Sequence, residues 1–267
     1  MRPVQDAWPG SVQMLGAVTE ATMDEGRNTM RMLGLLGGMS WESTLLYYRL
    51  LNEGVKARLG GLHSAPLLLW SLDFAPVAEL QAAGEWEVLG RELGGAGRRL
   101  AQAGAEALLI CTNTMHRVHA EVEAAAGVPA IHIADATGAA LRRAGCRRPA
   151  LLGTRFTMED AFYRARLAER HGVEALVPDE AGRTLVHEVI YGELCRGIIR
   201  PESKTAYLEV IGRLREEGAD SVILGCTEVT LLIGQPDIDL PVFDTTAIHA
   251  NAGVEFIVGK NTVAAVS

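Results

Sequence analysis

The stretch Gly104-Ala-Glu-Ala-Leu-Leu-Ile-Cys-Thr-Asn-Thr114 recurs later in the chain, without a gap, as Gly218-Ala-Asp-Ser-Val-Ile-Leu-Gly-Cys-Thr-Glu228. Each copy has a glycine that can end a helix, a short apolar strand, and small polar residues at the strand's carboxyl end. Upstream, Leu33–Ser40 resembles Ala150–Thr154, since each is an apolar strand that breaks into glycine and hydroxyl residues. Two similar half-chains predict one site assembled between two related lobes.

The repeat also decides which residues can face that site. Cys111 and Thr112 are neighbours on a predicted strand, and strand side chains alternate between faces, so both cannot point into the same cleft. The gapless alignment places Thr112 opposite Cys226 and Cys111 opposite Gly225. We therefore expect Thr112 to face the site and Cys111 to belong to the strand core.

Composition narrows the possible functions. The chain has 267 residues, of which 48% are hydrophobic, enough to bury a core in one large or two small domains. Its 25 basic and 33 acidic residues give a net charge of −8, which disfavours nucleic acid as a partner. No apolar stretch approaches the roughly 20 residues that span a bilayer. We expect a cytoplasmic protein without membrane contact, in which residues 1–30 form a poorly ordered extension that lacks the apolar core of a signal peptide.

Short apolar runs alternate with longer helical patterns, which is typical of βαβ units and parallel sheets. An α/β fold of two Rossmann-like lobes is predicted, each a roughly four-stranded parallel sheet flanked by helices. We expect residues 31–135 and 245–267 in the first lobe and 136–244 in the second, with a helix near 248–258 packing back onto the first. The predicted strands are Met32–Leu36, Ala65–Trp70, Ala107–Cys111, Ala130–Ile133, Ala150–Leu152, Glu174–Val177, Ser221–Leu224 and Val242–Phe243.

The glycine-rich run Glu85–Ala103 has a helical pattern despite its glycines, which are poor helix formers. The four cysteines are too few and too scattered for a disulfide framework, and none forms a CxxC pair with metal-ligand spacing. Free thiols and no metal site are therefore expected.

Cys226 stands where a predicted strand gives way to a helix beginning near Thr227. An unperturbed thiol has a pKa of about 8.5, and the free N–H groups at a helix N-terminus stabilise its thiolate. We expect Cys226 to be reactive, with a buried small apolar residue as the alternative. Glu228 would oppose the thiolate, hold a proton or orient a substrate amine, or else serve only as a first-turn acid.

The matching cluster in the first half is Thr112, Asn113, Thr114 and His116. Asn113 and Thr114 can donate hydrogen bonds to a carboxylate or, alternatively, cap the following helix. His116 follows Thr112 by one helical turn, so the two can share a face, unless the histidine is simply packed.

Three further features are candidates for anion binding. Gly38, Met39 and Ser40 open a predicted helix and can present backbone N–H groups to an anion, although tight turns need glycine anyway. Arg155 and Arg200 could anchor a distal carboxylate, although most arginines are solvated. Nothing near the central lysine resembles a pyridoxal phosphate site, so cofactor-free chemistry is favoured.

These motifs together resemble the aspartate/glutamate racemase family: Cys111-Thr-Asn-Thr-Met-His116, Gly225-Cys-Thr-Glu228 and Leu35-Leu-Gly-Gly-Met-Ser40. The likeness covers about Arg31 to Gly259. It implies two lobes of parallel sheet with pseudo-twofold symmetry and a cofactor-independent site between them. In that family one thiolate removes the substrate's α-proton while an opposite thiol protonates the other face, and the residues after each cysteine bind the α-carboxylate.

One position departs from this two-thiol pattern. The first catalytic position is the residue before Asn113, which here is Thr112. A hydroxyl is too weak an acid to serve as the abstracting base, but it can pass a proton, directly or through water or His116, to a carbanion formed by Cys226. The resemblance thus implies racemisation of aspartate or glutamate, with Asn113, Thr114 and Thr227 on the α-carboxylate. We expect Cys226 to face the proton of the L-enantiomer, although the sequence does not fix which enantiomer it serves.

The departure leaves other functions open. Relatives of this fold with a single thiol in the second half include arylmalonate decarboxylases, and maleate isomerases and hydantoin racemases share the architecture. A non-catalytic dicarboxylate binder with an inert Cys226 is a further alternative. The expected partner is a small acidic amino acid, and a homodimer is plausible; the sequence does not fix which acidic amino acid is preferred.

Overall fold

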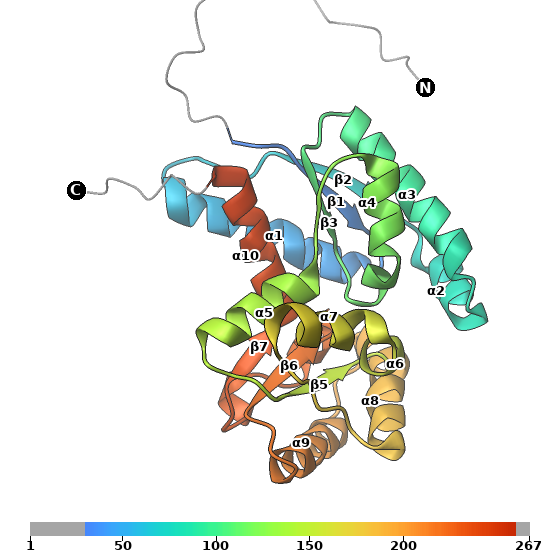
Figure 1. Cartoon of the computed structure of the whole chain (residues 1–267), viewed down its shortest axis with the longest axis vertical. Coiled ribbons are helices and arrows are strands. Elements are labelled where there is room, and N and C mark those ends of the chain that lie inside the picture. The colour runs from blue at the N-terminus through green and yellow to red at the C-terminus, as the bar shows by residue number, and fades with distance from the viewer. Residues whose placement is uncertain (1–29, 260–267) are drawn as a thin grey trace, which may run out of the picture.

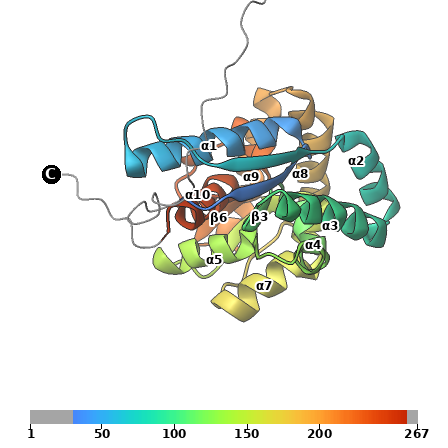
Figure 2. The same ribbon diagram turned by 90° about the horizontal axis from the view of Figure 1, so that it is seen from above.

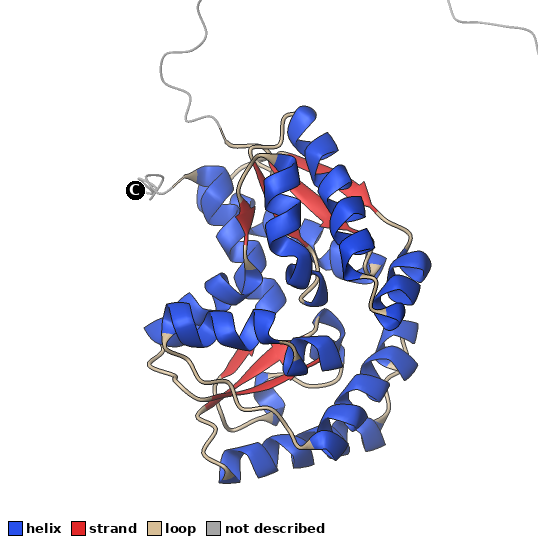
Figure 3. Ribbon diagram, turned by 45° about the vertical axis from the view of Figure 1, so that its right-hand side comes forward, coloured by secondary structure: helices blue, strands red, loops and turns tan. Residues whose placement is uncertain are grey.

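The computed structural model describes residues 30–259, so the extension expected over residues 1–30 lies outside the described residues except for its last position. Two separate parallel sheets, each covered by helices, make up the molecule (Figures 1 and 3). The α/β fold predicted from the alternating pattern is therefore confirmed.

The first sheet has the strand order β2-β1-β3-β4, with β1 at Leu33–Gly37, β2 at Leu67–Ser71, β3 at Ala107–Ile110 and β4 at Ala130–Ile131. All of its pairs are parallel, and Leu33 of β1 lies opposite Ala107 of β3. The helices of this half are α1 (Trp41–Leu59), α2 (Phe74–Ala83), α3 (Trp86–Gln102) and α4 (His119–Ala126), with a short 3-10 helix, η1, at Thr114–Val118.

The second sheet has the order β5-β6-β7, with β5 at Pro149–Gly153, β6 at Ser221–Gly225 and β7 at Val242–Asp244. Its α-helices are α5 (Ile133–Arg143), α6 (Arg155–Glu159), α7 (Ala161–His171), α8 (Glu180–Gly192) and α9 (Pro201–Glu216). The 3-10 helices η2 (Leu194–Arg196), η3 (Thr227–Leu231) and η4 (Gln235–Asp237) complete it, and α10 (Thr245–Val258) follows β7.

A fourth strand expected in this sheet, Glu174–Val177, is wrong. Leu176 makes only an isolated bridge to Ala150, with its N–H donating to the Pro149 carbonyl at 2.8 Å. Pro178 follows this segment directly and has no N–H to continue a ladder, so pairing stops after one bridge.

Helices cover both faces of the first sheet (Figure 2). On one face, Leu33, Leu35 and Leu109 pack with residues of α1 and α10; on the other, Leu36 and Leu108 pack with residues of α3 and α4. The helix expected near 248–258 is α10, and its contacts with α1 and β1 return the end of the described chain to the first sheet. Strand alternation thus fixes which side chains each helix covers.

The glycines of α3 allow this helix to approach its neighbours closely. A Cβ at Gly94 would lie 2.8 Å from the Cβ of Ala125 on α4, and one at Gly97 would lie 3.0 Å from Leu108 Cδ1. Both distances are below van der Waals contact, so the glycines that make α3 a weak helix by propensity allow its packing.

Candidate active site

A cleft lies between the carboxyl ends of the two sheets, as expected for parallel sheets. It contains about 400 Å³ of space not occupied by protein atoms, counting the part open to solvent. Segments that follow β1, β3, β5 and β6 contribute to its lining, and α2, α8 and η2 add the rest. The lining residues are Met39, Ser40, Phe74, Gln81, Thr112, Asn113, Thr114, Thr154, Ile190, Tyr191, Cys195, Gly225, Cys226, Thr227 and Glu228.

Thr112 and Cys226 both line this cleft, each just beyond the end of a central strand. Cys111 is fully buried in the core between the first sheet, α1 and α10, where burial raises the pKa of its thiol. The structure therefore places the residue pair that the repeat predicts, Thr112 with Cys226, and removes Cys111 from the cleft. The hydroxyl of Thr112 has no hydrogen-bond partner within residues 30–259.

The environment of Cys226 differs from the one expected. A five-residue 3-10 helix, η3, follows this cysteine, and the thiol donates to Glu228 Oε2 at 3.0 Å. Burial, followed by the negative charge of Glu228, raises the pKa of the Cys226 thiol well above its ordinary value. The expectation that a helix N-terminus would stabilise the thiolate is wrong, because desolvation and a carboxylate outweigh a short 3-10 turn.

Glu228 is the centre of a hydrogen-bond network between the two halves. Ser40 and Ser43, from the start of α1, donate to its Oε1 at 2.8 and 3.0 Å. Thr227 donates to Oε2 at 2.7 Å and also contacts the Ser43 hydroxyl. The carboxylate is only 7% exposed, and these neutral donors hold its charge in place.

This network changes the expected role of Thr227. Its hydroxyl proton is donated to Glu228, so the side chain positions that carboxylate instead of being free for a substrate carboxylate. Glu228 itself was expected near the thiol, and the structure places it in direct contact with Cys226.

The orientation of Asn113 is fixed by a chain of hydrogen bonds. Thr245 donates its hydroxyl proton to the Leu224 carbonyl at 2.8 Å, so its oxygen can only accept from the side-chain NH₂ of Asn113 at 3.0 Å. Asn113 Oδ1 is therefore left as a buried acceptor, with no partner in the part of the chain that the structure describes. An acceptor suits an ammonium group, while the second N–H of the same amide is still a donor, so the contact of Asn113 with a carboxylate stays a prediction.

Thr114 and Thr154 hydrogen-bond to each other at 2.9 Å across the two halves, and both line the cleft. Thr154 also accepts from the backbone N–H of Thr157, which makes it the N-cap of α6. Thr154 also lies within hydrogen-bond distance of the Thr157 hydroxyl, at 3.2 Å. When Thr154 donates to Thr114, the Thr114 proton is left to donate to a substrate carboxylate.

His116 does not line the cleft. Its Nδ1–H donates to the Thr112 carbonyl at 2.8 Å, and its Nε2 accepts from the backbone N–H of Ile133 at 3.1 Å. Burial, followed by the nearby His249 and His119, lowers the pKa of His116 well below its ordinary value. Both ring nitrogens of the neutral His116 therefore make hydrogen bonds within the protein. The ring positions Thr112 through its carbonyl. The expected contact of His116 with the substrate, or its role as a proton relay, is wrong.

Neither arginine expected to anchor a distal carboxylate reaches the cleft. Arg155 is exposed, donates to Thr184 at 3.2 Å and lies 3.8 Å from Glu159. Arg200 is also exposed and lies 3.7 Å from Glu193. Each begins a helix or stands just before one, where the side chain extends into solvent.

The segment after β1 behaves largely as expected. Met39 and Ser40 line the cleft, while Gly38 supports them from behind. Gly38 has φ of 85°, and a Cβ there would lie 2.1 Å from the Leu72 carbonyl oxygen, so only glycine fits. Gly38 thus shapes the site without facing it.

Several lining residues were not predicted as site residues. Thr154 carried a signal, since it follows the repeated strand in the second half. Phe74, Gln81, Ile190 and Tyr191 carried none, because they lie on helices that reach the cleft only through the packing of α2 and α8 around its edge. Among residues 30–259, no helix is long and apolar enough to cross a membrane, and no three potential ligands are arranged to hold a metal ion.

Comparisons with known proteins agree with this geometry. The family model described as Asp/Glu/hydantoin racemase matches residues 36–253. A Yersinia pestis protein proposed to be an Asp/Glu racemase is 51% identical over 86% of this chain and all of its own, with a TM-score of 0.82. An aspartate racemase homologue from Pyrococcus horikoshii OT3 is 33% identical with the same coverages and a TM-score of 0.75. The broad specificity amino-acid racemase RacX of Bacillus subtilis (strain 168) is 23% identical over 58% of this chain and 66% of its own.

Proposed function

The chain belongs to the Asp/Glu/hydantoin racemase family and is a racemase, and we propose that it interconverts amino-acid enantiomers, those of aspartate or glutamate, by cofactor-independent proton transfer. One observation carries this proposal. Cys226 and Thr112 follow the central strands of two facing sheets and line the same cleft, so an α-carbon between them is open to proton transfer on both faces.

The first step requires a thiolate at Cys226. Because burial and Glu228 raise the pKa of this thiol, it needs a local proton acceptor, and Glu228 Oε2 already accepts its hydrogen bond at 3.0 Å. The S–H bond breaks as the proton passes to Glu228, and the resulting thiolate takes the α-proton of the substrate. The negative charge left on the α-carbon delocalises into the α-carboxylate.

The substrate's polar groups are held by neutral side chains. Asn113 Oδ1 accepts from the α-ammonium group, and the Thr114–Thr154 pair donates to the α-carboxylate. A donor placed at that carboxylate stabilises the carbanionic state more than the ground state, since negative charge grows there during deprotonation.

The second step returns a proton to the opposite face. The Thr112 hydroxyl gives its proton to the α-carbanion, which is a much stronger base than an alkoxide. Thr112 then recovers a proton from solvent, and Glu228 releases to solvent the proton that it took from Cys226. Since a hydroxyl does not ionise usefully near neutral pH, Thr112 is a poor abstracting base. We therefore propose an enzyme that deprotonates one enantiomer quickly and its mirror image slowly, with Cys226 serving the L-enantiomer.

The deciding experiment is α-proton exchange in D₂O, followed by NMR, for each enantiomer of aspartate and glutamate separately. Exchange of one enantiomer with appearance of its mirror image is expected, and a Cys226→Ala variant should lose it. A Cys111→Ala variant should keep it, because Cys111 lies in the core. Loss of exchange in folded Cys111→Ala would contradict the assignment of Thr112.

Because the residue paired with Cys226 in the repeat is Thr112 and not a second thiol, decarboxylation or isomerisation of a malonate- or maleate-like dicarboxylate is a second candidate. The apolar side chains of Phe74 and Ile190 in the lining favour such a substrate if it carries an aryl group. No α-proton exchange with any amino acid, together with carbon dioxide release from an arylmalonate, would support this candidate. No turnover of any of these substrates, together with alkylation of Cys226 that no ligand slows, would instead indicate a non-catalytic binder.

A further inference from the structure

The outer wall of the cleft is built from uncharged side chains. Phe74 and Gln81 come from α2, Ile190 and Tyr191 from α8, and Cys195 from η2. Helices α2 and α8 lie on the side of the molecule away from α10 (Figure 1). Since Asn113, Thr114 and Thr154 are assigned to the α-ammonium and α-carboxylate groups, the lining residues from α2, α8 and η2 are left for the substrate's side chain. These five residues define the side-chain wall.

The polar groups of this wall both donate and accept. Tyr191 donates its hydroxyl proton to Gln81 Oε1 at 3.2 Å, and Gln81 Nε2 donates to Met115 Sδ at 3.0 Å. Gln81 is only 3% exposed, so these contacts fix its amide group. One amide N–H and the lone pairs of the phenol and amide oxygens remain for a ligand. A side-chain amide or hydroxyl can use both kinds of group, whereas a carboxylate can only accept.

The charges of the lining residues also favour a neutral side chain on the substrate. In the described part of the chain, Glu228 is the one carboxylate among the lining residues. No lysine or arginine of that part is among them. Three arginines outside the lining have carboxylate partners: Arg155 with Glu159, Arg200 with Glu193 and Arg117 with Asp160. Burial, followed by Cys226, Cys195 and Glu228, raises the pKa of Tyr191, so its phenol keeps its proton near neutral pH.

An amino acid with a neutral side chain enters such a cleft as a zwitterion without net charge. Aspartate and glutamate bring one additional negative charge, which meets the like charge of Glu228 and no lysine or arginine among the lining residues within positions 30–259. We infer that the side-chain wall selects uncharged side chains, so that the enzyme uses glutamine and asparagine more efficiently than glutamate and aspartate. This inference rests on the proposed racemase function and extends its substrate range beyond acidic amino acids.

The isosteric pairs glutamine/glutamate and asparagine/aspartate provide the test, because each pair differs in charge and scarcely in shape. L-enantiomers of all four are compared by α-proton exchange in D₂O with the wild-type protein. The expected result is a kcat/KM at least tenfold higher for the amide of each pair. Equal or faster exchange of the acids would overturn the inference and leave the racemase proposal standing, whereas no exchange with any of the four would overturn both.

A charge-introducing variant tests the location of the wall. Gln81→Lys places a cation opposite Tyr191 and should shift the glutamate-to-glutamine ratio of kcat/KM at least tenfold towards glutamate. The matched control is Gln102→Lys, the same substitution at an exposed position of α3 far from the lining, which should leave the ratio unchanged. An unchanged ratio in folded Gln81→Lys would contradict the assignment.

A double variant tests the competing explanation that an arginine moves in to bind the acid. Arg155→Gln with Arg200→Gln should leave the glutamate-to-glutamine ratio unchanged, because both side chains are exposed and lie outside the lining. A selective loss of glutamate and aspartate turnover would show that one of them anchors a distal carboxylate, and the inference would fail. Both substitutions are at exposed residues, so we expect the double variant to fold. It therefore tests the inference even if Gln81→Lys does not fold.

Discussion

At the scale of single residues, Thr112 sets the direction of the proposed chemistry. It lines the cleft with an unpartnered hydroxyl among the described residues, and His116 holds its carbonyl from behind. Its neighbour Cys111 has the more acidic functional group but lies in the core on the opposite face. One position along a strand therefore decides whether a thiol or a hydroxyl faces the substrate.

Restoring a thiol at this position should remove the handedness. Thr112→Cys is expected to raise the α-proton exchange of the D-enantiomer at least tenfold, because a thiol ionises far more readily than a hydroxyl. Exchange of each pure enantiomer in D₂O measures this. Thr112→Ser keeps a hydroxyl and serves as the control, so equal D-exchange in the two variants would contradict the role of Thr112.

The pKa of Cys226 gives a second prediction at this scale. Glu228→Gln replaces the carboxylate with an amide of the same shape, which should lower the pKa of the Cys226 thiol because a negative charge in contact with it is removed. The pH profile of Cys226 alkylation by iodoacetamide, read by peptide mass spectrometry, should shift by about one pH unit or more towards acid. Glu121→Gln, on α4, is the control and should leave the profile in place; an alkaline shift in Glu228→Gln would sink the prediction.

At the scale of elements, close packing explains the glycines of α3. Gly94 lies against Ala125 of α4, whereas the Cβ position of Gly95 has only Arg99 nearby, at 3.6 Å. The two adjacent glycines therefore differ: a side chain at position 94 would clash with α4, whereas position 95 has room for one.

Gly94→Ala should destabilise the protein by about 1–2 kcal/mol, because overpacking against Ala125 outweighs the gain in helix propensity. Gly95→Ala is the matched control and should stabilise it by roughly 0.5–1 kcal/mol through the unfolded chain and helix propensity. Urea unfolding followed by circular dichroism measures both. If Gly94→Ala left the free energy of unfolding unchanged or raised it, α3 and α4 would be able to move apart without a loss of stability.

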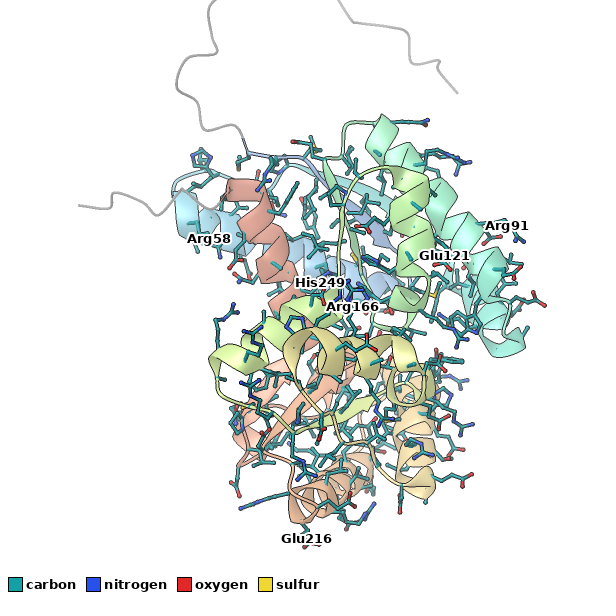
Figure 4. The ribbon with its side chains drawn as sticks, viewed as in Figure 1. Arg58, Arg91, Glu121, Arg166, Glu216 and His249 are labelled. Carbon is teal, nitrogen blue, oxygen red and sulfur yellow. The ribbon has the colours of Figure 1, made fainter. Side chains whose placement is uncertain are left out.

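At the scale of the whole molecule, four buried histidines gather where the chain passes between the two sheets. Ring centroids lie 4.8 Å apart for His116 and His132, 5.3 Å for His116 and His249, and 4.6 Å for His119 and His132. His132 is the N-cap of α5, and His249 lies on α10 at the junction (Figure 4). Both connections between the sheets therefore run through this histidine cluster.

Stability should fall as the pH drops below about 6.5. Burial lowers the pKa of His116 and His132, and lowers that of His249 to about 4. The unfolded chain takes up these protons near pH 6.5 and the folded chain does not, so the stability present above that pH is lost as the pH falls towards the folded values. Each histidine contributes a slope of up to about 1.4 kcal/mol per pH unit.

Urea unfolding at pH 7.5, 6 and 5 measures this slope. His249→Gln should reduce the slope by up to about 1.4 kcal/mol per pH unit, since one buried proton acceptor is removed. His63→Gln, at an exposed loop position, should leave it unchanged. Unfolding free energies that do not change between pH 7.5 and 5 would contradict the neutral state of the cluster.

Much of this molecule was predictable from sequence because its signals are local. The alternation of apolar runs with helical patterns predicted the α/β fold, and seven of the predicted strand segments overlap strands of the structure. Strand alternation alone separated Cys111 from Thr112, since it depends only on neighbouring positions. The failure at Glu174–Val177 has a local cause too, because Pro178 ends the pairing after one bridge.

The sequence by itself determined the two related halves, the cleft at the strand ends and the pair Thr112 and Cys226, since repeat, period and strand direction are properties of the chain. Tertiary structure alone decided the charge and polarity of the site. It places Glu228 against the thiol and leaves Asn113 with a free acceptor among the described residues. It also buries His116 with both ring nitrogens hydrogen-bonded and leaves the two candidate arginines outside the cleft lining. The physical reason is that a pKa and a hydrogen-bond direction depend on which groups from distant segments share a buried volume, and only packing sets that.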